Sequence, residues 1–167
     1  MLLWFVGTAL IAMWFTFRDP AIDHRLVIVG AVLPDVVDAW SVKTNLMHTL
    51  AAPIVLMMGL MICTIGRRRF RRHALAVPIG IFWHSVFDGA WMNTEAFWWP
   101  VTRLTNGDTN IPLAERGVLL IVVMEIIGLA LLVWSWRLMG MNEPERRRLF
   151  LRSGHLDRDL IDSKTKG

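Results

Sequence analysis

One apolar segment decides the fold class of this chain: GVLLIVVMEIIGLALLVWSWRLMG, residues 117–140. Glu125 and Arg137 are its only ionisable residues. A helix needs about 20 mostly apolar residues to cross the hydrocarbon core of a bilayer. The segment therefore predicts a transmembrane helix.

Further apolar segments flank it along the chain. Residues 1–17, 49–65 and 74–92 reach the length of a span on a generous count. Residues 26–40 are shorter, and we favour a complete span there over a tilted or re-entrant piece. We expect an all-α, polytopic integral membrane protein with about five transmembrane helices in one bundle (1–140) and a cytoplasmic basic tail (141–167).

The composition agrees with a membrane protein. Hydrophobic residues make up 54% of the chain, and the mean hydropathy is +0.45. Nine Trp and no Tyr are present, and Trp favours the boundary between membrane and water. Cys63 is the single cysteine, which excludes an internal disulfide and a thiolate metal cluster.

The arginines predict the orientation. Cytoplasmic loops of membrane proteins carry an excess of Lys and Arg. Two basic segments lie on either side of a pair of predicted helices, at 67–72 and 137–152. Both are expected in the cytoplasm, which places the N-terminus outside and the C-terminus inside the cell (plasma or inner) membrane.

Apart from orientation, the sequence assigns little function to the basic residues. The tail arginines could rest on anionic headgroups, but a solvated tail that only fixes topology is the simpler expectation. No nucleic-acid-binding fold is visible, so no nucleic-acid partner is expected. We expect His24, His73 and His155 to be solvated or interfacial, and Asp23 in the first cytoplasmic loop carries no functional signal.

Ionisable residues inside the apolar segments are the main functional signal. An acid costs roughly 2.5 to 3.5 kcal/mol at a helix centre, so ionisable groups in apolar helices usually face each other or a wet cavity. The set comprises Asp35, Asp38, His48, His84, Asp88 and Glu125.

Spacing and depth predict that these groups converge. Asp35 and Asp38 are three residues apart, and His84 and Asp88 are four apart, so each pair shares one helical face. The predicted topology puts all six groups in the outer half of the membrane, although it was built from arginines alone. Glu125 lies about 12 Å into its helix at 1.5 Å per residue.

The residue types indicate a divalent cation. Carboxylates and imidazoles suit Zn, Mn, Fe or Mg better than copper(I) or an iron–sulfur cluster, and Zn is our first choice. The metal ligands would be Asp35, Asp38, His48, His84 and Asp88. Pro34 cannot donate to the carbonyl of Gly30, so it should bend the helix and free an acceptor.

These motifs resemble those of a known family. The run Gly30-Ala-Val-Leu-Pro-Asp-Val-Val-Asp38, the pair His48-Thr49, the helix His84-Ser-Val-Phe-Asp88 and the pair Trp99-Pro100 are similar to those of the YdjM-like membrane-bound proteins. That family is regarded as metal-dependent hydrolases, and the resemblance covers roughly residues 26–100. It implies the same five metal-site residues. Many members have a His in the first helix, which this chain lacks.

Three functions remain open from the sequence. The first is metal-assisted hydrolysis near the extracytoplasmic face, with Asp38 or Glu125 as the proton acceptor and a lipid-like ester or phosphoester as substrate. The second is a small transporter or an ion or proton pathway, for which a homodimer could supply symmetry. The third is a structural membrane protein whose polar cluster only fixes helix packing.

Overall fold

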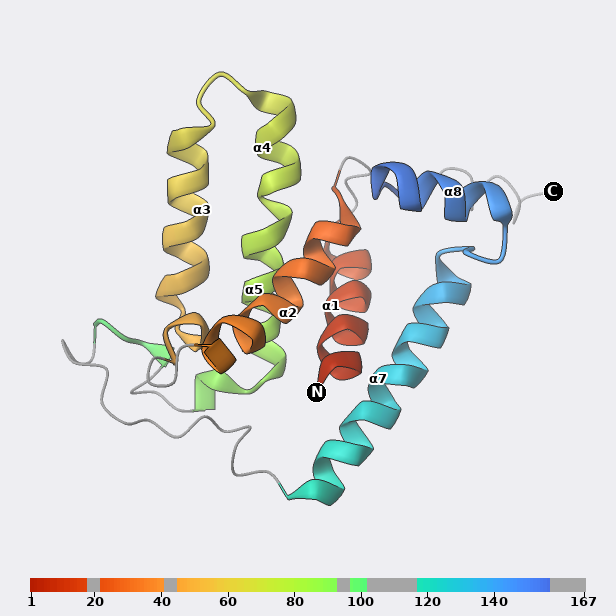
Figure 1. Ribbon diagram of the computed structural model, residues 1–167, viewed down its shortest axis with the longest axis horizontal. Coiled ribbons are helices and arrows are strands. Elements are labelled where there is room, and N and C mark those ends of the chain that lie inside the picture. The colour runs from red at the N-terminus through yellow and green to blue at the C-terminus, as the bar shows by residue number, and fades with distance from the viewer. Residues whose placement is uncertain (18–21, 41–44, 93–96, 102–116, 157–167) are drawn as a thin grey trace.

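The computed structural model describes residues 1–156 except 18–21, 41–44, 93–96 and 102–116, and leaves 157–167 undescribed. Within these described residues the chain is all-helical (Figure 1). The α-helices are α1 (Leu2–Thr16), α2 (His24–Trp40), α3 (Ala51–Cys63), α4 (Arg68–Ala74), α5 (Ala76–Phe87), α7 (Val118–Leu138) and α8 (Pro144–Ser153). Two short 3₁₀ turns, η1 (Asn45–His48) and η2 (Ala90–Met92), precede α3 and follow α5.

The predicted helices are present with shifted ends. The prediction of a loop at 67–72 is wrong, because α4 begins at Arg68 and α5 continues along the same axis (Figure 1). The turn before α4 contains Gly66, which has a φ of +85. Of the described helices, α7 alone is long and apolar enough to cross a membrane by length and composition, and α1 and α3 are shorter apolar helices. Pro34 lies inside α2 without ending it.

The helices alternate in direction. Figure 1 shows α1, α3 and α7 running one way and α2 and the continuous α4–α5 pair running the other. The arginine-bearing α4 and α8 consequently lie at one end of the molecule, while the end of α5 and the start of α3 lie at the opposite end (Figure 1). We call these the arginine end and the histidine end, since the latter holds His48 and His84.

Two helix contacts dominate the packing, α2 against α5 and α1 against α7. Both are close because glycines face each other. A Cβ on Gly128 would collide with the backbone of Trp4, and a Cβ on Gly7 would lie 2.7 Å from the carbonyl oxygen of Gly128. Small residues at such crossings let helix backbones approach and gain van der Waals contact.

Buried side chains form two clusters. One joins α1, α2 and α5 through Ala9, Met13, Val27, Ala31 and Ala76. The other joins α1 to the end of α7 and to Leu156 beyond α8. In the segment expected to be a solvated tail, Met141 and Leu156 are 3% and 6% exposed and pack in this cluster, whereas none of the residues of α8 between them is buried.

Candidate metal centre

The site begins with the crossing of α2 and α5. A Cβ on Gly80 would lie 2.8 Å from the Cα of Gly30 and would collide with the carbonyl oxygen of Val27. A Cβ on Gly30 would likewise collide with the carbonyl oxygen of Val77. Only glycine at both positions lets the two backbones approach this closely, and one turn further along α5 the side chain of His84 reaches α2.

His84 is fully buried and oriented by the backbone of α2. Its Nδ1 lies 2.7 Å from the carbonyl oxygen of Ala31. Since a carbonyl only accepts, Nδ1 carries the proton and donates, and the lone pair of this neutral ring is on Nε2. A histidine that ligates a metal commonly has its other nitrogen held in this way. The acceptor is the carbonyl of Ala31, one residue beyond the Gly30 carbonyl that Pro34 was expected to free.

His48 meets His84 from another element. It ends η1, and its Nε2 lies 3.2 Å from Nε2 of His84. The two rings are 5.1 Å apart between centroids, with an interplanar angle of 71°. Both imidazoles therefore present the same nitrogen to one point.

Asp35 completes a group of three. Its Oδ1 lies 3.5 Å from Nε2 of His84 and 3.9 Å from Nε2 of His48, and one ligand atom from each residue lies within 4.8 Å of the others. Ligands bound tetrahedrally at about 2.0 to 2.2 Å from zinc are about 3.3 to 3.6 Å apart. The observed separations fit this arrangement with small adjustments, so the donor set can hold a divalent cation.

Asp88 lies next to His48. It is fully buried at the end of α5, and its Oδ2 is 3.9 Å from Nε2 of His48. Its backbone N–H donates to the carbonyl of His84 at 2.8 Å. Asp88 follows His84 by one helical turn, as predicted. Its carboxylate lies next to His48 and is thus a second carboxylate beside the cluster.

The two predicted proton acceptors have different outcomes. Asp38 lies in α2, but its side chain falls outside the described part of the structure. The carboxylate of Glu125 accepts the backbone N–H of Leu3 at 3.1 Å and lies 3.5 Å from the amino nitrogen of Met1. Glu125 thus satisfies a donor in the first turn of α1 and is not among the grouped ligands.

Sequence reasoning missed the part played by α1. Phe5, which is 1% exposed, places its ring 3.9 Å from the ring of His84 between centroids. The indole N–H of Trp4 donates to the carbonyl of Phe87 at 3.1 Å. The first helix therefore covers the buried side of His84 with an aromatic ring. The run of apolar residues in α1 carries no periodic signal that could single out these two positions.

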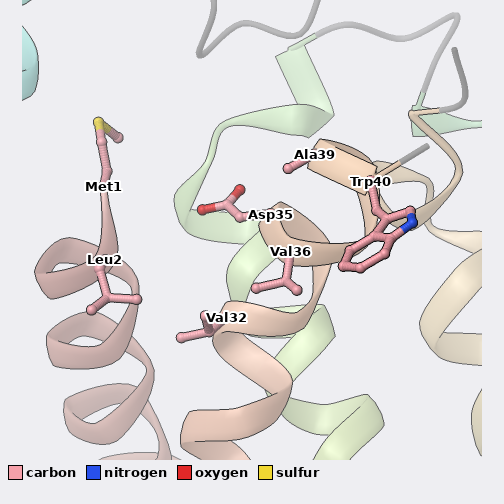
Figure 2. Close-up of a pocket in the computed structure, with 7 residues that line it drawn as sticks. All are labelled: Met1, Leu2, Val32, Asp35, Val36, Ala39 and Trp40. Carbon is pink, nitrogen blue, oxygen red and sulfur yellow. The ribbon is translucent and has the colours of Figure 1, made fainter. Parts of the chain in front are cut away.

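A pocket opens next to the ligands. It has a volume of about 660 Å³ and is lined by Met1, Leu2, Val32, Asp35, Val36, Ala39 and Trp40. Figure 2 shows the Asp35 carboxylate directed from α2 toward the space that faces the start of α1. Asp35 is the one charged side chain in this lining, and its side chain is 31% exposed, whereas that of His84 is buried. The cluster therefore borders the pocket at Asp35, and the other lining side chains are apolar.

The arginine end holds a separate polar cluster, centred on Asp23 and Arg25. Asp23 is 4% exposed and pairs with Arg25 through Nη2 at 2.8 Å and Nε at 3.0 Å. Burial acts to raise the pKa of Asp23, but the hydrogen bonds and charge of Arg25 outweigh burial and hold that pKa below its ordinary value. Arg25 therefore stabilises the charged form of this buried carboxylate.

The histidines at this end are also partly enclosed. His24 is 4% exposed, and its backbone N–H donates to the carbonyl of Gly154 at 3.0 Å. The ring of His155 stacks on that of His73, with centroids 5.4 Å apart. These contacts join the start of α2, the end of α4 and the residues after α8.

No protein-family model, curated protein or solved structure matches this chain. The geometry of the cluster is therefore the basis for the functional argument.

Proposed function

We propose that the chain is a membrane-bound, metal-dependent hydrolase with its site near the extracytoplasmic face. The observation that carries the proposal is the 3.2 Å separation of the Nε2 atoms of His48 and His84, with Oδ1 of Asp35 3.5 Å from the second of them. Three separate elements supply these atoms, and Asp35 also lines an apolar pocket.

The membrane placement rests first on α7. This helix has 21 residues, a length of about 31 Å at 1.5 Å per residue, which matches the hydrocarbon thickness. Only 11% of its apolar window is buried, so α7 is unlike the core helix of a water-soluble protein. The apolar α5 continues the arginine-bearing α4 and, like α1 and α3, would need flanking residues or a locally thinner bilayer to complete a crossing.

The orientation rests on the two ends of the molecule. The arginines of α4 and α8 share one end, and by the positive-inside rule we assign this end to the cytoplasm. The cluster of His48, His84 and Asp35 then faces the extracytoplasmic side. On this basis we propose five spans: α1, α2, α3, α4–α5 and α7.

The residues of the cluster would divide the proposed reaction between them. His48, His84 and Asp35 would hold the cation, with zinc preferred for two imidazoles and a carboxylate, and Asp88, next to His48, would be a fourth donor. A cation bound there would polarise an ester or phosphoester oxygen and lower the pKa of a water molecule. With a cation bound, the hydrogen bond to the Ala31 carbonyl would keep the Nε2 lone pair of His84 directed toward it. Asp38 is the proton acceptor we propose from the sequence.

The pocket supports a lipid-like substrate. Its walls are apolar apart from Asp35, and most of its lining comes from the last turns of α2 and the start of α1. An acyl or isoprenoid chain could lie against Val32, Val36 and Leu2 while its ester or phosphoester group reaches Asp35. A substrate delivered from the membrane would need no aqueous tunnel.

The decisive experiment is elemental analysis of protein purified in detergent without chelators. We expect about one equivalent of zinc in the wild type and in the control His73→Ala, and almost none in His84→Ala. Asp35→Asn, at a partly exposed position, gives a second variant if His84→Ala does not fold. Ester and phosphoester substrates with long apolar chains should then be cleaved by the zinc-loaded protein alone.

Other outcomes separate the alternatives. If the wild-type protein retains no metal after zinc addition and dialysis, the proposal is overturned. The polar cluster would then only fix the packing of the helices. Bound metal with no cleavage of any chain-bearing ester or phosphoester, but with cation flux into liposomes, would favour an ion pathway.

A further inference from the structure

A second hollow lies at the corner between α7 and α8, far along the chain from the metal ligands. It has a volume of about 250 Å³ and is lined by Leu132, Val133, Trp136, Arg137 and Asn142. Figure 1 shows α8 crossing the end of α7 rather than continuing along its axis. The hollow therefore lies where the apolar helix gives way to the arginine end.

The polar end of this hollow consists of hydrogen-bond donors. Arg137 is exposed in the last turn of α7. The indole N–H of Trp136 donates to Oδ1 of Asn142 at 3.2 Å, which leaves the amide NH₂ of Asn142 as a donor. Among the described lining residues no carboxylate competes for the guanidinium, whereas nearby Arg146 already pairs with Glu143 at 3.2 Å. A cation and an amide donor suit an anionic oxygen, above all a phosphate.

The apolar end of the hollow lies toward the middle of α7. Leu132 and Val133 precede Trp136 by about one helical turn, and Val133 is 47% exposed. Trp134 and Trp136 are each also 47% exposed, as expected for indoles at a membrane boundary. A ligand that spans the hollow must be apolar along α7 and negatively charged at Arg137.

We infer that this corner binds one anionic phospholipid of the cytoplasmic leaflet. Its phosphate contacts Arg137 and the amide of Asn142, and the first carbons of its chains lie on Leu132 and Val133. A free phosphate would leave the apolar wall unused. The inference rests on the proposed membrane placement but not on the metal or on hydrolysis.

The test is native mass spectrometry of the detergent-purified protein with equal amounts of phosphatidylglycerol and phosphatidylcholine. We expect one phosphatidylglycerol to be retained in preference to phosphatidylcholine, and inorganic phosphate at millimolar concentration not to displace it. Arg137→Gln should lower that preference about fivefold, as expected for one surface cation near an anionic leaflet. Arg148→Gln, an exposed arginine of α8 outside the hollow, is the matched control and should keep the preference.

The outcomes are distinct from those of the hydrolase test. Equal retention of both lipids, or an equal loss in Arg137→Gln and Arg148→Gln, would mean only diffuse charge attraction and would overturn the site. Displacement by inorganic phosphate would replace the lipid with a free anion and also overturn it. Zinc measured in the same samples reports separately on the metal centre, since Arg137→Gln should leave the zinc content unchanged.

Discussion

The Nε2 atoms of His48 and His84 lie 3.2 Å apart although 36 residues separate the two histidines in the chain. The two histidines belong to different elements, His48 to η1 and His84 to α5, so their distance depends on how these elements pack together. At this separation the two nitrogens fit either an N–H···N hydrogen bond or the coordination of one cation by both. The predictions below test this arrangement and the helix packing that supports it.

Asp35 should dominate the affinity for zinc, because it supplies the negative charge at the accessible side of the cluster. Asp35→Asn keeps the shape of the side chain and removes its charge. We expect zinc binding to weaken by more than about 100-fold, beyond the loss of an outer hydrogen-bond partner. Zinc titration against a competing chelator measures this change. An affinity within threefold of the wild type would exclude Asp35 as a ligand.

Gly80→Ala should disrupt both stability and metal binding. The new Cβ would lie 2.8 Å from the Cα of Gly30, so α2 and α5 must separate, at a cost of roughly 1 to 3 kcal/mol for overpacking. The melting temperature in detergent should fall, and the zinc content should fall with it because His84 moves away from Ala31.

Gly59→Ala is the matched control for that variant. Gly59 also lies inside a helix, α3, but a Cβ there would meet no atom within 4 Å. Alanine should be neutral or stabilising by up to about 1 kcal/mol, since it loses less backbone entropy on folding. Equal destabilisation by the two variants would contradict a special role for the crossing.

Glu125→Gln separates a structural role of Glu125 from the predicted catalytic one. Glutamine keeps an oxygen that can accept the N–H of Leu3, now 3.1 Å from Oε2, but it cannot take up a proton. We expect zinc content and hydrolysis within about twofold of the wild type, with Glu125→Leu lowering stability by about 0.5 to 2 kcal/mol, as for other lost helix N-terminal acceptors. A large loss of hydrolysis in Glu125→Gln with zinc retained would restore the general-base hypothesis.

The stability of the arginine end should depend on pH through Asp23. Its pKa is held below the ordinary value by Arg25, so the folded state binds this proton less readily than the unfolded state. The contribution is complete above about pH 5 and is lost as the pH falls through about 4 and below. We expect Asp23→Asn to be less stable at pH 7, because it loses the charged hydrogen bonds with Arg25. The loss should be only about 1 to 2 kcal/mol, because Arg25 is partly solvated.

The check for Asp23 is the melting temperature between pH 7 and pH 3. The difference between wild type and Asp23→Asn should shrink as the pH falls. Glu145→Gln, at an exposed acidic position in α8, should show no such dependence. A difference that grows toward low pH would have the wrong sign for a depressed pKa.

Cysteine labelling tests the proposed orientation. Cys63 is the single cysteine, so Cys63→Ala gives a background for single introduced thiols. In intact cells we expect an impermeant maleimide to label Val101→Cys, at a position that is 86% exposed, and to label Glu145→Cys only after permeabilisation. The reverse pattern would invert the topology, and equal labelling of both sites would rule out a spanning α7.

The sequence by itself determined the helices and the candidate ligands. Long apolar segments predict helices because a buried backbone must satisfy its own hydrogen bonds, and α7 lies within two residues of the predicted 117–140. Asp35, His48 and His84 stood out because polar groups among apolar residues need a partner. Both signals are local and can be read from composition and spacing.

The tertiary structure alone decided which of these residues meet. The crossing of Gly30 with Gly80 sets the distance between α2 and α5, and no periodicity reports where two helices touch. The same holds for Phe5 against His84, for Glu125 at the start of α1, and for Asp23 with Arg25 beside Gly154. These contacts depend on the relative positions of whole helices, which arise from the summed packing of the chain rather than from any one segment.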